Sequence, residues 1–315
     1  MIEPRKTYVI ANPAGRGGWV GLNWHRLSAE IRAVLGDEVQ FLQTQSIGDG
    51  VRCAREAVDA GATTLVSFGG DGTHSEVADG IMRAGVGQRV SLGILHAGTG
   101  GDFRRMLHAS DDLTTACQTI ADSEPVAVDC GWVEYMTEAG EARGRHFLNV
   151  ATTGIGGLVD RFVNESKHRL RGGPAYALAT LRANMVYKPA EVTLEVGSEN
   201  VGTYDISAVA VCNGRWCGGG MMIGPGARLQ DGLLDVVVLE AASTLRSLPV
   251  LTGIYKGTHT QSRLVHVFQG QRVRVTPHRN KAYMDIDGEA PGIAPASYQV
   301  RANALRVHGV RPEFL

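Results

Sequence analysis

The sequence predicts an α/β fold in which an N-terminal doubly wound parallel sheet is followed by a second, mostly antiparallel β domain. Two observations carry this prediction. Strand patterns alternate with helix patterns over residues 7–95, as in β–α units. From residue 126 onward, strand patterns dominate. Because parallel sheets of this kind bind ligands beyond the carboxyl ends of their strands, we expect the chemistry of the first domain at those ends.

The first half divides into short strands and amphipathic helices. Apolar, β-favouring runs predict strands at residues 7–11, 39–44, 63–68 and 90–95. Apolar residues at helical spacing predict helices at residues 24–35, 51–58 and 74–84. Gly36 and Gly61 follow the first two helices as C-caps.

The second half shows short strand patterns with few helices. Strands are predicted at residues 126–135, 147–153, 192–196, 206–213, 234–240, 264–268, 271–275 and 282–286. Helices are predicted at residues 158–167, 174–187 and 244–256. No repeat or low-complexity linker separates the halves. The change of pattern predicts domains at residues 1–128 and 129–300, with residues 301–315 returning to the first domain.

Composition excludes several classes of protein. The formal net charge of −1 argues against a nucleic-acid partner. The five cysteines lack metal-ligand spacing, which argues for buried thiols rather than disulfides or zinc. No apolar run approaches the roughly 18 residues that span a bilayer, and no signal peptide is visible. We therefore expect a cytoplasmic protein.

Three glycine clusters follow predicted strands, at residues 12–18, 68–73 and 97–103. Glycine lets the backbone approach a ligand closely, and successive amides can form a nest for phosphate oxygens. The second cluster opens a helix, where Thr73 and Glu76 have the spacing of a capping box. The helix N-terminus would add positive charge beside a phosphate. The alternative is that these clusters are ordinary turns. Neither a P-loop motif nor a dinucleotide motif is present.

The second cluster, Gly69-Gly70-Asp71-Gly72-Thr73, resembles the signature of the diacylglycerol kinase catalytic domain family, which includes sphingosine and ceramide kinases. The other matches are Asn12-Pro13, Gly98 to Phe103, Asn213, Gly218-Gly219-Gly220, Pro225, Ala227, Asp231 to Asp235, and Asp287-Gly288-Glu289. Gly101 departs from the family's asparagine, and His96-Ala97 from its proline-leucine pair.

This resemblance implies a phosphofructokinase-like nucleotide-binding domain at residues 1–128 and a β-rich lipid-binding domain at residues 129–300. It implies that ATP is the phosphoryl donor, bound by Asn12, Gly17, Thr44, Gly69, Gly70, Asp71, Gly72, Thr73 and Thr99. For Thr44, a plain hydroxyl at a strand end is the alternative.

The resemblance also implies two Mg²⁺ sites. Asp71, Asp102 and Asp129 would surround the catalytic ion, and Asp231 with the backbone carbonyls of Arg228 and Leu233 would hold a structural ion. Oxygen ligands with retained water suit Mg²⁺. For Asp129 and Asp231, ordinary turn residues remain the alternative.

A general base should remove the proton of the attacking hydroxyl. Asp285, Asp287 and Glu289 alternate, and Gly288 should break the strand and present the last two at a turn. The family places its base in this element, which makes Asp287 and Glu289 candidates, with Asp71 as a third. A solvated Asp-Gly hairpin turn is the alternative.

The sequence thus predicts an ATP-dependent lipid kinase that acts on diacylglycerol or a related lipid such as ceramide or a sphingoid base. The partner would be a lipid at the inner face of a membrane, approached through the basic run Arg161 to Arg171. For this run, a solvated helix face is the alternative. A soluble-substrate kinase of the NAD kinase type and an inactive lipid-binding regulator are the alternatives. A homodimer is compatible with the resemblance, because family members are often dimers.

Overall fold

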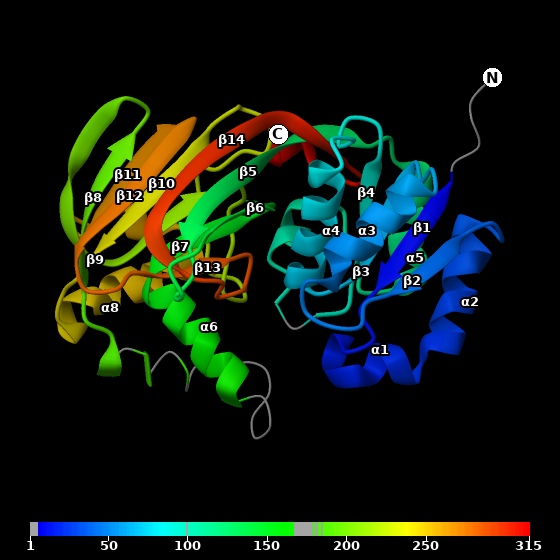
Figure 1. Cartoon of the computed structure of the whole chain (residues 1–315), viewed down its shortest axis with the longest axis horizontal. Coiled ribbons are helices and arrows are strands. Elements are labelled where there is room, and N and C mark those ends of the chain that lie inside the picture. The colour runs from blue at the N-terminus through cyan, green and yellow to red at the C-terminus, as the bar shows by residue number, and fades with distance from the viewer. Residues whose placement is uncertain (1–5, 99, 167–178, 180–181, 184) are drawn as a thin grey trace. The chain divides into compact units, whose positions relative to one another are not determined.

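The computed structural model describes residues 6–98, 100–166, 179, 182–183 and 185–315. The chain divides into two compact units. Unit 1 comprises residues 1–130, 229–231 and 302–315, and unit 2 comprises residues 131–228 and 232–301. Strands β5 (Val126–Met136) and β14 (Ile293–Val307) contribute residues to both units (Figure 1).

Unit 1 contains a parallel sheet in the order β2-β1-β3-β4. Its strands are β1 (Thr7–Ala11), β2 (Gln40–Gln43), β3 (Thr64–Gly69) and β4 (Ser91–His96). The last residues of β14 pair in parallel with β4, which places the C-terminal segment in this unit. Apolar, nearly fully buried side chains of β1 and β3 explain why these strands lie at the centre of the sheet.

Helices connect the strands of unit 1. They are α1 (Trp19–Leu22), α2 (Trp24–Leu35), α3 (Asp49–Asp59), α4 (Asp71–Arg83) and α5 (Leu113–Asp122), with short 3-10 turns η1 (Gly15–Gly18), η2 (Phe103–Met106) and η5 (Pro312–Phe314). Leu27 and Ile31 of α2 share a buried cluster with Ile120 of α5. Figure 1 shows α3 and α4 side by side, where a Cβ at Gly80 would lie 2.5 Å from that of Ala54.

Unit 2 is built from antiparallel strands, as the sequence predicted for the second domain. They are β6 (Ala142–Phe147), β7 (Val150–Gly154), β8 (Ala190–Val196), β9 (Glu199–Cys212), β10 (Leu234–Glu240), β11 (Val265–Gly270), β12 (Arg272–Arg279) and β13 (Tyr283–Ile286), together with β14. Helical segments of the described part of unit 2 include α6 (Ile155–Ser166), α8 (Thr244–Gly253), η3 (Ile254–Lys256) and η4 (Thr258–Gln261).

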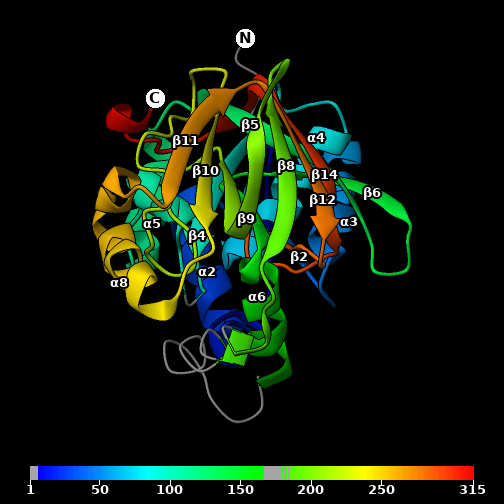
Figure 2. The ribbon, with the colours of Figure 1, turned by 90° about the vertical axis from the view of Figure 1, so that its left-hand side faces the viewer.

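Alternating burial along β8 explains its place in the core, because every second residue of Ala190–Val196 is buried. Figure 2 shows β8, β9, β10 and β11 running beside one another, with α8 next to the β10 and β11 end. The single strand predicted at residues 147–153 is wrong: the end of β6 and the start of β7 share that stretch. The helix predicted at residues 174–187 lies largely outside the described residues.

Candidate active site

Three loops meet at the carboxyl ends of strands β1, β3 and β4 in unit 1. Parallel pairing sets Ala11 opposite Phe68 and Gly69 opposite His96, so the loops that follow start at one edge. The side-chain amide of Asn12 donates to the Thr73 hydroxyl over 3.1 Å. The amide of Arg16 donates to the Ala97 carbonyl over 3.0 Å, which joins the first loop to the third.

Glycine is required where the second and third loops touch. A Cβ at Gly98 would lie 2.6 Å from the Cα of Gly70, and one at Gly69 would lie 2.5 Å from the Thr73 hydroxyl. The first loop bends through positive φ at Arg16 (49°) and Gly17 (68°). These glycines therefore allow close backbone approach, which is also what a phosphate-binding nest needs.

Helix α4 begins at the second loop, with Gly70 as its N-cap residue and Asp71 and Gly72 in its first turn. The capping box predicted for Thr73 and Glu76 is wrong, because no side chain caps this helix and Thr73 lies inside it. Glu76 instead accepts hydrogen bonds from the amides of Gly48 (2.7 Å) and Gly50 (2.8 Å) at the start of α3. The first amides of α4 are therefore not capped by a side chain.

Asp71 organises the third loop. Its carboxylate accepts hydrogen bonds from the amides of Gly101 (2.8 Å), Asp102 (3.3 Å) and Phe103 (3.4 Å). Gly101 has φ of 69°, a left-handed conformation that glycine and asparagine adopt most readily. A Cβ there would lie 2.9 Å from the His96 Nε2 atom. Glycine in place of asparagine thus keeps the turn and leaves room for His96.

Two histidines beside Asp71 were not anticipated as site residues. His74 is buried, and its Nδ1 atom lies 2.8 Å from the Ser67 hydroxyl. Burial lowers the pKa of His74 to about 4, although the Asp71 charge acts in the opposite direction. Burial also lowers the pKa of His96. Both rings are therefore neutral near pH 7, and the only sequence signal was His96 in place of a proline.

Asp102 and Asp129, two further aspartates predicted to bind metal, are buried. Asp102 lies at the start of η2, with one carboxylate oxygen 3.4 Å from the Arg105 Nε atom. Asp129 on β5 accepts a hydrogen bond from the Asn303 amide over 2.7 Å. Among the described residues, no three His, Cys, Asp or Glu side chains form a metal-binding group.

The remaining five predicted residues lie in different parts of the chain. Asp231 belongs to unit 1, whereas Arg228 and Leu233 belong to unit 2. Thr44 is buried, and its amide donates to the Ala11 carbonyl over 2.9 Å, which extends the pairing of β1 with β2. Thr99 lies outside the described residues.

In unit 2, Asp287 and Gly288 form a tight turn after β13. Both have positive φ, 50° and 87°, and Ile286 and Glu289 exchange backbone hydrogen bonds across them. This is the geometry that Asp-Gly favours in two-residue hairpins. The hairpin turn named as the alternative is present, but Asp287 within it is buried rather than solvated.

Asp287 also anchors a neighbouring segment. Its buried carboxylate accepts hydrogen bonds from the amides of Leu148 (2.7 Å), Asn149 (3.0 Å) and Val150 (3.0 Å). The Asn213 side chain donates to the Leu148 carbonyl over 2.6 Å, which ties the same segment to β9. Asp287 therefore fixes the backbone between β6 and β7.

Glu289 is held differently. It forms an ion pair with Arg145 of β6, and the two side chains are 24% and 12% exposed. Arg145 was not identified from the sequence, because nothing local links it to a residue so distant along the chain. Of the two carboxylates in this turn, Glu289 is the one that does not hold backbone amides in any described contact.

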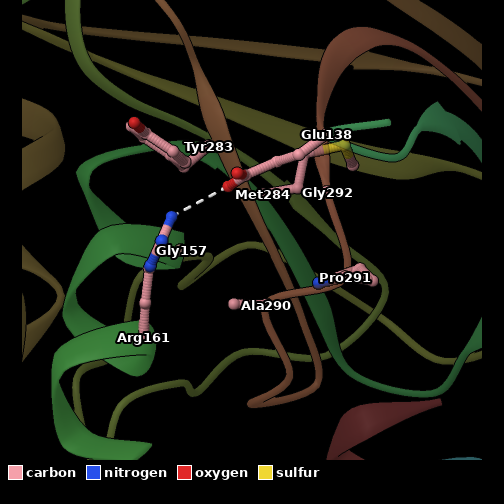
Figure 3. Close-up of a pocket in the computed structure, with 8 residues that line it drawn as sticks. All are labelled: Glu138, Gly157, Arg161, Tyr283, Met284, Ala290, Pro291 and Gly292. Carbon is pink, nitrogen blue, oxygen red and sulfur yellow. Dashed lines mark hydrogen bonds and ion pairs between the residues drawn. The ribbon is translucent and has the colours of Figure 1, made fainter. Parts of the chain in front are cut away.

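A cavity of about 560 Å³ lies beside this turn within unit 2. Its lining residues are Glu138, Gly157, Arg161, Tyr283, Met284, Ala290, Pro291 and Gly292. Figure 3 shows Arg161 extending from α6 toward Glu138, which it meets in a 2.9 Å ion pair. The basic run that begins at Arg161 otherwise lies outside the described residues from Lys167 onward.

Two family models match the chain in succession. The diacylglycerol kinase catalytic domain matches residues 6–133, and the YegS C-terminal NAD kinase beta sandwich-like domain matches residues 149–309. The chain belongs to the diacylglycerol kinase family of the YegS type. Membership of this kinase family makes the protein a phosphotransferase and implies ATP as the phosphoryl donor.

Relatives in this diacylglycerol kinase family are similar over much of their length. A probable lipid kinase YegS-like protein of Chromohalobacter salexigens is 32% identical to this chain. The matched region covers 65% of this chain and 62% of that relative's length. One of Pseudomonas fluorescens is 31% identical over 90% of this chain and 89% of its own. The chain is also similar to the crystal structure of a diacylglycerol kinase from Bacillus anthracis str. Sterne. The superposition covers 100% of both chains with a TM-score of 0.70 at 18% identity, which shows a shared fold.

Proposed function

We propose that this protein is an ATP-dependent lipid kinase, which transfers the γ-phosphoryl group of ATP to a hydroxyl group of a lipid such as diacylglycerol, ceramide or a sphingoid base. Its relatives, named probable lipid kinases, support a lipid as the acceptor. The observation that carries the proposal is the junction of three glycine-containing loops at the start of α4.

The three loops supply what a triphosphate requires. Backbone amides and the partial positive charge at the start of α4 favour bound phosphate oxygens. The hydrogen bond between Asn12 and Thr73 holds the first two loops together, and Asp71 holds the third. Contacts between residues of the loops therefore fix these parts of the proposed site relative to one another.

Asp71 and Asp102 would hold the catalytic Mg²⁺. Mg²⁺ usually keeps several waters and binds one or two carboxylates together with substrate phosphates, so a pair of aspartates fits it without a third protein side chain. When bound, the ion would neutralise charge on the phosphate oxygens. A role for Asp129, and for Asp231 with the carbonyls of Arg228 and Leu233, rests on the sequence motifs alone.

We assign the general base to Glu289. In this reaction the acceptor oxygen bonds to the γ-phosphorus, the bond to the β-phosphate oxygen breaks, and Glu289 takes the hydroxyl proton. Arg145 fixes the carboxylate of Glu289. Asp287 acts indirectly, because its carboxylate is buried as well as held by three amides, and it positions the backbone of residues 148–150. The carboxylate of Asp71 also accepts from three amides, but Asp71 is only partly buried.

The cavity beside the turn is our proposed entrance for the lipid headgroup. It adjoins Ala290, the residue after Glu289. Arg161 and Glu138 contribute polar groups to it, and Ala290 and Pro291 contribute apolar surface. Such a mixture suits a headgroup attached to an acyl chain.

Transfer of label from γ-labelled ATP to a total lipid extract, with products identified by mass, tests this function. NAD serves as the competing acceptor. We expect label in a lipid, and loss of that label in Asp71→Asn but not in the control Asp59→Asn, an exposed aspartate of α3. Label in NAD alone would favour a soluble-substrate kinase. Nucleotide binding without transfer to any lipid would favour an inactive regulator.

A further inference from the structure

Helix α8 and the adjoining turn η3 carry apolar side chains on two opposite faces. Val250 and Ile254 point into unit 2, where they are 7% and 4% exposed within a buried cluster. The other face presents Leu245 (85% exposed), Leu248 (55%), Leu251 (50%) and Tyr255 (60%). Leucines exposed to this degree on one short segment form a patch, unlike single surface leucines, which need no explanation.

The spacing of these residues places them in one stripe. Steps of three, three and four residues from Leu245 to Tyr255 follow one side of a helix. Val250 and Ile254 fall on the opposite side and pack with Ile223 and Val265. Figure 2 shows α8 at the outside of unit 2, next to β10 and β11. The stripe therefore faces away from the core that α8 covers.

The charged residues of the segment that carries the stripe have one sign. Arg246 and Lys256 are exposed on the same segment, and the exposed Arg263 follows η4. The sequence contains no aspartate or glutamate from residue 241 to residue 284. Glu240, the nearest acidic residue before α8, contacts His266 at 2.5 Å. A stripe of leucines on a segment whose own charged side chains are all basic is complementary to an anionic, apolar partner.

We propose that α8 and η3 form a membrane-docking surface for an anionic bilayer. Leu245, Leu248 and Leu251 enter the boundary between headgroups and acyl chains, Tyr255 lies at the headgroup level, and Arg246 and Lys256 contact lipid phosphates. A second copy of the chain is a poorer occupant, because a two-fold interface places the same basic face on both sides. The inference rests on the proposed function in one respect only, that a lipid acceptor gives the protein a reason to meet a membrane.

Flotation of the full chain with vesicles tests this surface. Vesicles of phosphatidylcholine with and without phosphatidylglycerol are compared at low salt and at about 0.15 M salt, where the Debye length is about 8 Å. We expect binding to the anionic vesicles that weakens with salt. The joint variant Leu245→Ala, Leu248→Ala, Leu251→Ala should bind at least about tenfold less. Arg246→Gln and Lys256→Gln should each reduce binding about fivefold.

Matched controls lie in unit 1. Ile47→Ala removes an equally exposed apolar side chain, and Arg55→Gln removes an exposed arginine, so neither should change flotation. Circular dichroism confirms that each variant is folded. Equal binding by the triple-alanine variant, or no binding of the wild type, overturns the proposal. A lipid-free dimer that the triple-alanine variant converts to a monomer also overturns it and assigns the stripe to contact between copies.

The kinase assay separates failure of docking from failure of the proposed function. With lipid dispersed in detergent, the triple-alanine variant should turn over as fast as the wild type, because no bilayer is needed. Vesicle binding without phosphoryl transfer would support the docking surface and reject the kinase function. Phosphoryl transfer in detergent without vesicle binding would support the kinase function and reject the docking surface.

Discussion

The two carboxylates of the Asp-Gly-Glu turn should respond differently to the loss of charge. Asp287→Asn changes a buried side chain that accepts three backbone hydrogen bonds. A carboxamide can keep the bonds to Asn149 and Val150, but its NH₂ group then faces the Leu148 amide. One charge-assisted hydrogen bond is lost and two donors meet, which costs about 2–4 kcal/mol.

Glu289→Gln removes a charge at a partly exposed ion pair with Arg145. The glutamine carbonyl can still accept from Arg145, so the stability cost should be about 1 kcal/mol. If Glu289 is the general base, the chemical step should nevertheless slow by about 10²–10⁴-fold. The substitution that damages the fold less should therefore damage catalysis more.

Thermal unfolding and single-turnover phosphoryl transfer together measure this contrast. At about 2–4 °C per kcal/mol, Asp287→Asn should lower Tm by about 4–16 °C and Glu289→Gln by a few degrees at most. Single-turnover rates are taken well below both Tm values. Normal turnover by Glu289→Gln, or an unchanged Tm for Asp287→Asn, would refute the assignment of base to one residue and anchor to the other.

Three other substitutions address unit 1. Gly98→Ala should weaken ATP binding at least about tenfold by calorimetry, because its Cβ would collide with Gly70. Glu76→Gln should lower Tm by several degrees, since the start of α3 loses a charged acceptor, worth about 1–2 kcal/mol; an unchanged Tm would contradict this. Because the folded pKa of His74 is about 4, below its ordinary value, stability should fall as pH drops from about 6.5 toward 4. His74→Gln should flatten that decline in Tm, and an identical slope would reject His74 as its source.

Local patterns predicted what local residues determine. Strand β1 and helix α2 lie at the predicted residues, because an apolar run and a helical stripe each specify their own element. Strand β14 was missed, since Arg301, Asn303 and Arg306 interrupt its apolar alternation. Strand β6 was missed for a similar reason, because its residues are largely charged or small.

The candidate site depended on contacts between distant residues. The motif of the second loop identified Asp71 as a site residue. It did not predict that the Asp71 carboxylate accepts hydrogen bonds from the amides of residues 101–103. Glu76 matched a capping box, yet two amides at the start of α3 compete for its carboxylate. Arg145 stands 144 residues before its ion-pair partner. The fold brings such partners together, and their spacing along the sequence does not predict the contact.

The central claim is that the three loops of unit 1 hold the phosphates of the donor. Amide hydrogen exchange with and without a non-hydrolysable ATP analogue tests it most directly. We predict slower exchange at residues 12–18, 69–73 and 100–103 when the analogue saturates the protein, and no comparable change around α8. Saturating binding that leaves those three loops unprotected and protects another part of the chain would contradict the account.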